Sequence, residues 1–285
     1  PLIDGRRAKG PTILVALEVA VNRAGYVGSG SVVSGEFSGS VTKADIFLDE
    51  LTSDVTAFFP DNLSSLNFWL DADDASTITT SGTSVTVWSD KTSNGFDVSQ
   101  STPSLQPTYD PNNFTKNERP VIEFPGDQDL RMGNYTTSAN QTIYMVAKVD
   151  VVGNNSQSLL SMDGANDFQL DAGNNSIFNF RARTTNIHSS MQGTLNYENV
   201  YYIYTYILDF DNNTASIYVN NSLINSVSDY NTALSATTTL YIGVNRGLNQ
   251  MLNGKFAEVL IFNEALDSTN QTNIYNYLND KWDIV

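Results

Sequence analysis

The chain has 285 residues, of which 40% are hydrophobic and only 16% charged, and its formal net charge is −16. This length suffices for one large β domain with an appendage, or for two domains. The acidic balance argues against nucleic acid and anionic membranes as partners, because binding to phosphate groups requires clustered lysine and arginine side chains. The sequence has no cysteine, which excludes disulfides, zinc–thiolate sites and thiol nucleophiles.

The first 60 residues differ in composition and residue pattern from the rest of the chain. Residues 11–21 form an apolar run compatible with a strand or a short helix, since it mixes β-branched residues with alanine and leucine. Residues 28–41 carry a glycine every few positions, which indicates short strands with bulges. Such a region buries little surface by itself. We therefore expect residues 1–60 to form a small β-rich extension that packs on a partner or on the main domain, and that anchors the protein to partner chains or to sister subunits.

We expect no signal peptide and no membrane segment. Basic residues at 6–9 precede the apolar run in the manner of a secretory signal, but Glu18 interrupts that run early. No apolar run reaches the roughly 18–20 residues that a membrane-spanning helix requires. The sequence therefore favours synthesis in a cytoplasm.

From residue 66 onward, short strands alternate with turn clusters. The predicted strands are 84–88, 121–124, 142–149, 158–161, 168–170, 177–180, 201–208, 215–219, 239–243 and 254–263. Strands of this length and spacing predict an all-β domain, a two-sheet antiparallel β-sandwich (jelly roll), over residues 64–285. Trp69 and Trp88 lie in strand patterns, so we expect both indoles in the core rather than as stacking platforms for sugars.

The C-terminal stretch predicts a strand followed by a turn and a short helix. Strict alternation over 254–263 would place Phe256, Leu260 and Phe262 on one face and Ala257, Val259 and Ile261 on the other. Ser268 and Gln271 have the spacing of a capping box. Ile274, Leu278 and Trp282, with Tyr275 beside them, form one apolar stripe, so we expect the helix to dock on the preceding sheet.

Five segments, in a fixed order, resemble the laminin-G-like, concanavalin A-like domain family. They are residues 66–73, 87–97, 106–109, 119–130, and 254–263 with the following helix and Lys281-Trp282. The first contains Leu-Asn-Phe-Trp-Leu-Asp-Ala-Asp and the second Trp-Ser-Asp-Lys-Thr-Ser-Asn-Gly. The resemblance covers about residues 64–285. It implies a module that binds carbohydrate or protein, of the kind found in bacterial surface proteins and phage structural proteins.

The sequence does not indicate an enzyme or a cofactor. A glycosidase needs two carboxylates facing each other across a cleft, and the nearest glutamates, Glu258 and Glu264, do not share a strand. We expect Glu258 to be a hydrogen-bonded structural acid. His188, the single histidine, is expected in a surface loop. A degenerate hydrolase is the least favoured of the functions that we compare.

Candidate binding residues lie in predicted loops. The resemblance implies that calcium can bind at the rim of the sandwich, and the acidic turns are Asp71/Asp73/Asp74, Asp127/Asp129, Asp163/Asp167 and Asp209/Asp211. Each is also compatible with an ordinary solvated turn, and Asp127 and Asp129 are the best metal candidates. The candidate carbohydrate ligands, which combine an aromatic face with amide and guanidinium groups, are Asn134, Tyr135, Asn245, Arg246 and Asn249.

Our leading hypothesis is a phage virion structural protein, such as a capsid decoration, head-fibre or tail-attached protein. Residues 1–60 would contact other virion proteins, and the sandwich would bind cell-surface glycan weakly during adsorption. A homo-oligomer is compatible with this role, and the protein would reside in the virion. The alternative is a carbohydrate-binding module of a bacterial surface or secreted protein.

Overall fold

The structure is a computed structural model that describes residues 58–112, 118–150, 157–163, 168–172, 177–182, 191–194 and 200–284. The chain divides into two compact units, residues 1–59 and 60–285, and every described helix and strand belongs to the second. The expected N-terminal extension, His188 and Asp167 lie outside the described residues. In the described part of the chain, no helix is long and apolar enough to cross a membrane.

Two sheets make up the domain, as the alternation pattern predicts. Sheet A has the spatial order β1 (Leu66–Asp71), β17 (Asn253–Phe262), β8 (Gln141–Val149), β13 (Tyr201–Asp209), β14 (Thr214–Val219) and β15 (Ser222–Val227). Sheet B has the order β7 (Leu130–Thr136), β16 (Thr237–Ile242), β9 (Gln157–Met162), β10 (Phe168–Ala172), β11 (Ile177–Ala182) and β12 (Met191–Thr194). The strand pairs described are all antiparallel.

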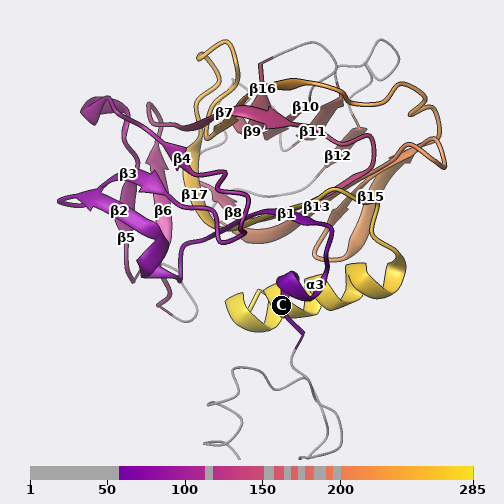
Figure 1. The fold of residues 1–285 in the computed structure, drawn as a ribbon, viewed down its shortest axis with the longest axis horizontal. Helices are drawn as coiled ribbons and strands as arrows, with labels where there is room; N and C mark the ends of the chain where they lie inside the picture. The colour runs from indigo at the N-terminus through magenta and orange to yellow at the C-terminus, as the bar shows by residue number, and fades with distance from the viewer. Residues whose placement is uncertain are drawn as a thin grey trace, which may run out of the picture. The chain divides into compact units, whose positions relative to one another are not determined.

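Short strands connect the two sheets at one end. They are β2 (Ile78–Ser81), β3 (Ser84–Trp88), β4 (Val98–Ser99), β5 (Thr108–Asp110) and β6 (Val121–Pro125), with the 3-10 turns η1 (Pro60–Asn62), η2 (Ala75–Thr77) and η3 (Pro103–Leu105). β6 pairs with the start of β17, and β4 pairs with β7. Sheet B lies on one side of sheet A and helix α3 (Ser268–Trp282) on the other (Figure 1).

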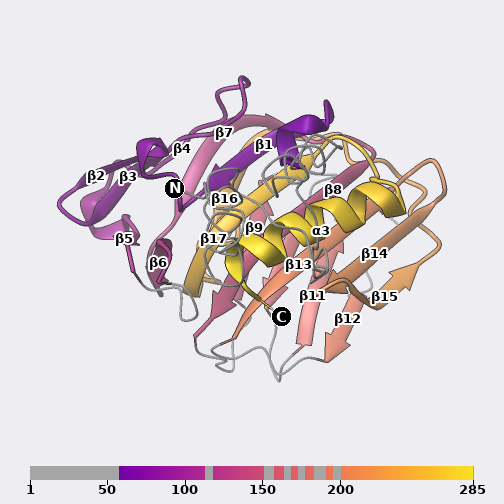
Figure 2. The ribbon, with the colours of Figure 1, turned by 90° about the horizontal axis from the view of Figure 1, so that it is seen from below.

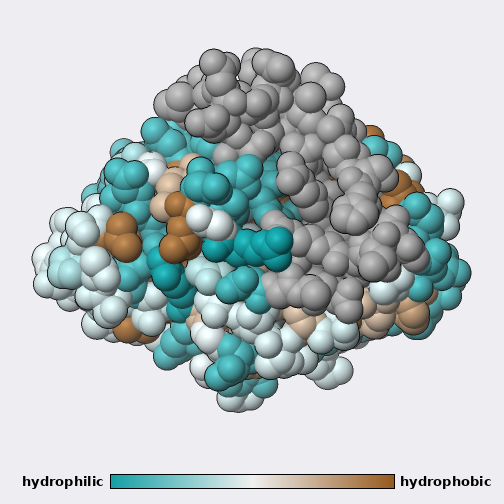
Figure 3. Space-filling model, turned by 90° about the horizontal axis from the view of Figure 1, so that it is seen from above, coloured by the Kyte–Doolittle hydropathy of each residue, from teal (hydrophilic) through white to brown (hydrophobic). Residues whose placement is uncertain are grey.

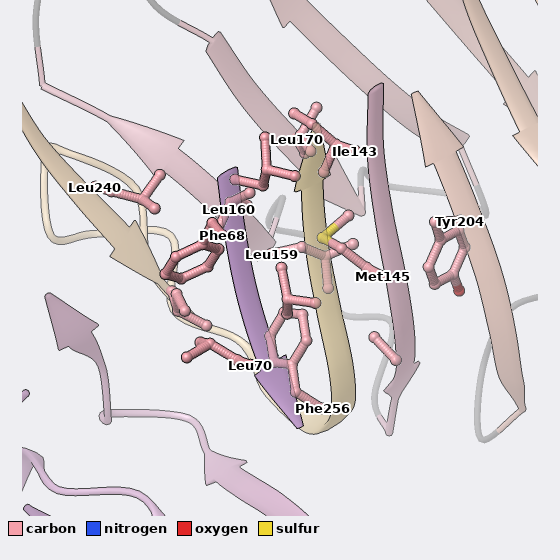
Figure 4. Packing of buried hydrophobic residues seen from close by; sticks show 14 of the residues in the cluster. Phe68, Leu70, Ile143, Met145, Leu159, Leu160, Leu170, Tyr204, Leu240 and Phe256 are labelled. Carbon is pink, nitrogen blue, oxygen red and sulfur yellow. The ribbon is translucent and has the colours of Figure 1, made fainter. Parts of the chain in front are cut away.

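The main core lies between the sheets and is continuous from β1 to β10. Phe68 and Leu70 on β1 and Leu160 and Leu170 of sheet B belong to one cluster of buried side chains (Figure 4). All nine residues of β8 are buried, because this central strand is covered by sheet B on one face and by α3 on the other. Trp88 and Trp69 are both buried, which confirms their expected place in the interior.

A β-bulge in β17 corrects the predicted pattern of its side chains. The register with β8 shifts between Phe256 and Glu258, which leaves Ala257 as the extra residue. Phe256 therefore joins Val259 and Ile261 in the core between the sheets. Glu258 remains on the face of Leu260, but this face is opposite to that of Phe256 and turns toward the helix. Strict alternation is wrong here because one inserted residue inverts the faces of all residues on one side of it.

Helix α3 begins one residue earlier than the predicted capping box requires. Asp267 is the N-cap, and its side chain accepts a hydrogen bond from the backbone N–H of Asn270 at 2.8 Å. Ser268 is already in the helix. The predicted stripe of Ile274, Leu278 and Trp282 is buried, and Tyr277 rather than Tyr275 is buried with it. The helix lies across the outer face of sheet A (Figure 2).

The N-cap assignment distinguishes two neighbouring residues. We expect Asp267→Ala to lower the free energy of unfolding by about 1 kcal/mol, because the first turn loses a capping acceptor. Ser268→Ala is the matched control and should change it by less than half as much. Equilibrium unfolding in urea measures both values, and a larger effect at Ser268 would contradict the assignment.

Candidate functional site

The loop between β16 and β17, residues 243–252, contains three of the predicted carbohydrate ligands. Gly243 has φ +80°, and a Cβ atom at this position would lie 2.4 Å from the ring of Phe124, so only glycine fits. The N–H of Gly243 bonds to Leu159 O at 2.9 Å, and the N–H of Leu252 returns to Gly243 O at 2.8 Å. These bonds fix both ends of the loop to sheet B.

Asn245 holds the loop in shape. Its Oδ1 accepts the backbone N–H groups of Asn249 and Gln250 at 3.0 and 3.1 Å. Its Nδ2 donates to Asn249 Oδ1 at 2.9 Å and to Gln250 Oε1 at 3.0 Å. Asn245 is buried, whereas Arg246 and Asn249 are exposed. The structure therefore brings Asn245, Arg246 and Asn249 together, with Asn245 as the support and the other two at the surface.

Two side chains of β10 extend this hydrogen-bonded network. Gln169 Nε2 donates to Gln250 Oε1 at 2.7 Å and contacts both carboxylate oxygens of Asp171 at 2.8 Å. Both residues are buried and alternate with Phe168 and Leu170 of the core, so they lie on the opposite face of sheet B. We call Asn245, Asn249, Gln250, Gln169 and Asp171 the rim cluster.

Along the same face, a transverse row crosses the neighbouring strands. The pairings Gln169–Ser161, Ser161–Tyr241 and Tyr241–Arg131 put these side chains on one face. The guanidinium carbon of Arg131 lies 5.5 Å from the centre of the Tyr241 ring, within range of a cation–π contact. Seen from this side, the described surface is mainly hydrophilic (Figure 3).

The metal candidates Asp127 and Asp129 are not brought together as ligands. Asp129 is fully buried and forms an ion pair with Arg131, and it also accepts from Gln100 Nε2 at 3.0 Å. Asp127 is exposed. Over the described ranges, no group of three or more carboxylate or histidine side chains is placed to hold a metal ion. A carboxylate already neutralised by arginine is a poor cation ligand, so this pair gives no support to the expected calcium site.

The prediction of a loop at Asn134 and Tyr135 is corrected by β7, which contains both residues. Asn134 is exposed, with φ +60°, where the register with β16 shifts. Tyr135 is fully buried, edge-on to Phe68 and Phe96 at 6.3 and 5.6 Å, so its ring offers no face to a sugar. The Gly133-Asn134 pair looks like a turn in sequence, but here it occupies a strand irregularity.

A second polar cluster lies between sheet A and α3. The fully buried Glu258 accepts from Trp69 Nε1 at 2.8 Å, Tyr277 Oη at 3.1 Å, Lys281 Nζ at 2.9 Å and Trp282 Nε1 at 2.6 Å. This confirms the prediction of a hydrogen-bonded structural acid. Burial raises the pKa of Glu258, and the ammonium group of Lys281 offsets only part of that effect.

Asp71 lies opposite Glu258 in the register of β1 and β17. Its Oδ1 is 2.6 Å from Lys281 Nζ, and its Oδ2 is 2.8 Å from Lys91 Nζ. Burial opposes ionisation, but the two ammonium groups outweigh it, so the pKa of Asp71 lies below its usual range. We call Asp71, Lys91, Glu258 and Lys281 the ionic cluster.

A sequence model of the concanavalin A-like lectin/glucanases superfamily, Laminin_G_3, matches residues 122–270. The chain belongs to this family. The described strands between residues 60 and 284 form the lectin-like β-sandwich that the sequence motifs predict for this family. No curated protein matches the chain.

Solved structures with the same fold include two binding or sugar-processing proteins. Trypanosoma rangeli sialidase in complex with sialic acid has 14% identity and a TM-score of 0.53, with 93% of this chain and 39% of that chain covered. The binding domain of Paraclostridial Mosquitocidal Protein 1 has 14% identity and a TM-score of 0.53, with 75% and 52% covered. At this identity the likeness shows the fold alone. The chain spans about two fifths of the sialidase and half of the toxin domain.

Sequence reasoning missed Gln169, Asp171 and Gln250. The available signal was the polar alternation within Phe168-Gln-Leu-Asp171, where polar residues occupy one face of a predicted strand. Nothing in the sequence places that face beside the loop 243–252, because the two segments meet only through the pairing of β9 with β10 and β16.

The loop geometry predicts unequal roles for its two asparagines. We expect Asn245→Ala to lower the free energy of unfolding by about 1–3 kcal/mol, because two backbone N–H groups lose their acceptor. Asn249→Ala, the matched control, removes one exposed acceptor and should have less than half that effect. Urea unfolding measures both, and equal effects would show that Asn245 does not organise the loop.

Proposed function

We propose that the domain of residues 60–285 binds carbohydrate through the loop 243–252 and performs no chemistry on it. The observation that carries this proposal is the rim cluster, whose hydrogen bonds hold the exposed Asn249 and shape the loop that also carries the exposed Arg246. Amide and guanidinium groups together donate to and accept from sugar hydroxyls. Because the loop is already ordered, little entropy is lost on binding. The lectin-like fold of the family adds support.

The positions of Glu258 and Glu264 support carbohydrate binding rather than glycoside hydrolysis. The carboxylate of Glu258 accepts hydrogen bonds from four donors and lies beneath helix α3. Glu264 is exposed, and its backbone carbonyl accepts from Thr142 Oγ1 at 2.8 Å in the turn before the helix. The two glutamates therefore do not flank a common substrate position, which a glycosidase requires.

We further propose that the chain is a phage virion structural protein, with the lectin-like domain displayed for adsorption. Two features of the sequence support this setting: the glycine-rich region of residues 1–60, and an acidic composition rich in asparagine, serine and threonine. In this proposal, residues 1–60 contact other virion proteins. The alternative is a carbohydrate-binding module of a bacterial surface or secreted protein, which a secretory signal upstream of this sequence would favour.

Carbohydrate binding is tested on a glycan array with the full chain. For a glycan that binds, we expect the double substitution Arg246→Ala and Asn249→Ala to weaken binding by at least about tenfold, equivalent to roughly 1.4 kcal/mol. The control Asn134→Gly alters another exposed asparagine and should leave binding unchanged. Binding that is lost in the control but kept in the double variant would place the site on β7 instead.

The virion proposal is tested by deleting residues 1–60 from the protein expressed in trans during phage growth. We expect the truncated chain to be absent from purified particles while the full chain is incorporated, because the anchoring contacts are removed. Immunoblotting of particles measures both. Equal incorporation of the two chains would contradict an anchoring role for this region.

A further inference from the structure

Within the ionic cluster, the amine of Lys281 contacts the two carboxyl groups of Asp71 and Glu258 in largely buried surroundings. Lys281 Nζ lies 2.6 Å from Asp71 Oδ1 and 2.9 Å from Glu258 Oε2. The side chains of Lys281, Asp71 and Glu258 are 13%, 5% and 0% exposed. Such a contact replaces a bimolecular encounter between amine and acid by a step within one molecule, which can raise its rate by many orders of magnitude.

Aromatic rings line the cluster on the helix side. Lys281 Nζ lies 5.0 Å from the centre of the Trp282 ring and 5.6 Å from that of Tyr277. Trp69 Nε1 and Trp282 Nε1 both donate to Glu258. In surroundings of low polarity the separated charges of an ammonium and a carboxylate lose much of their hydration. Lys281 Nζ and Asp71 Oδ1 are 2.6 Å apart, so a proton can pass between amine and acid over the length of one hydrogen bond.

We propose that Lys281 and Asp71 condense to form an amide bond that links the last turn of α3 to β1. The ammonium of Lys281 passes a proton through Glu258 to Asp71 Oδ1, and the freed amine attacks Asp71 Cγ. A second proton then moves from the nitrogen through Glu258 to the same oxygen. The C–Oδ1 bond breaks, one water leaves, and Glu258 returns to its starting state. No oxidant, cofactor or activated precursor is needed, because ammonium plus carboxylate contain the atoms and charge of amide plus water.

Lys91 has a separate role in this reaction. Its Nζ lies 2.8 Å from Asp71 Oδ2, the oxygen that becomes the amide carbonyl and that carries negative charge in the tetrahedral intermediate. A fixed positive charge at this oxygen stabilises that intermediate. Lys91 also pairs with Asp74 at 3.1 Å and is 21% exposed, and no contact with Glu258 is recorded for it. It is therefore placed to stabilise charge, whereas Lys281 contacts both carboxylates.

The geometry also selects Asp71 over Glu258 as the acyl partner. Both oxygens of Glu258 accept from indole and phenol donors in addition to Lys281, so that attack on its carboxyl carbon would break this set of hydrogen bonds. Asp71 Oδ1, in contrast, accepts only from Lys281 and from the backbone N–H of Asp73, at 3.1 Å, among its recorded bonds. The bond would join positions 210 residues apart. A link that closes so long a segment restricts the unfolded chain strongly.

The test is the mass of the purified, folded full chain, measured after denaturation. We expect a mass one water below that of the sequence. Digestion with trypsin should then yield residues 44–91 covalently joined to residues 256–285, with Lys281 uncleaved. A chain of full mass would overturn the proposal. So would a missing water that maps to another position, including a closed ring within 256–285 that indicates Glu258 as the partner.

Substitutions separate this reaction from an ordinary buried ion pair. Lys281→Arg keeps the positive charge but cannot form the bond, so its mass should equal the full sequence value. Glu258→Gln should also keep the water, because the proton relay is lost, and far-ultraviolet circular dichroism confirms that each variant is folded. The matched control is Lys255→Arg, which alters a buried lysine on β17 whose Nζ lies 3.4 Å from Glu123 Oε1. That variant should still lose one water, and a control that retains it would contradict the assignment to Lys281.

Discussion

The carboxylate of Glu258 is the constraint on which the packing of the C-terminal half depends. A fully buried charge is unfavourable unless donors surround it, and this one receives donors from β1 and from the last turns of α3. The helix is thereby fixed in rotation as well as in position, because Tyr277, Lys281 and Trp282 must all reach one side chain. The apolar stripe alone would allow α3 to slide or roll on sheet A. The bulge at Ala257 makes these contacts possible, because it turns Glu258 toward the helix and leaves Phe256 in the core.

The ionic cluster also explains why the family resemblance consists of short motifs scattered along the sequence. Asp71 belongs to the first motif, Lys91 to the second, Glu258 to the closing strand and Lys281-Trp282 to the end of the helix. These segments are far apart in the chain, yet in the structure they form one set of contacts between sheet A and α3. The motifs thus describe how the sandwich is closed. They carry no information about a ligand, which accounts for a clear prediction of the fold alongside a weak prediction of the site.

The fold could be predicted because alternation and turn residues are local signals. Residues 142–149 and 201–208 are strands, and Ile274, Leu278 and Trp282 form the buried stripe, as their spacing indicates. The errors arise where a single backbone irregularity changes the outcome. At Ala257 an inserted residue inverts the face, and at Gly133-Asn134 a turn-like pair lies inside a strand and takes Tyr135 into the core. The partnership of Gln169 and Asp171 with the loop 243–252 depends on strand pairing across sheet B, which no local pattern encodes.

The two polar clusters of the domain differ in what surrounds them, and this difference separates their roles. The rim cluster reaches the surface at Asn249, beside the exposed Arg246 of the same loop, so its hydrogen bonds shape a segment that an external ligand can reach. The ionic cluster lies against the indole rings of Trp69 and Trp282, so its largely buried groups bond to one another rather than to an external ligand. A binding loop keeps its geometry only if the sheets beneath it are rigid. The contacts of β1 and β17 with α3 stabilise the face of sheet A opposite the core, while sheet B carries the loop.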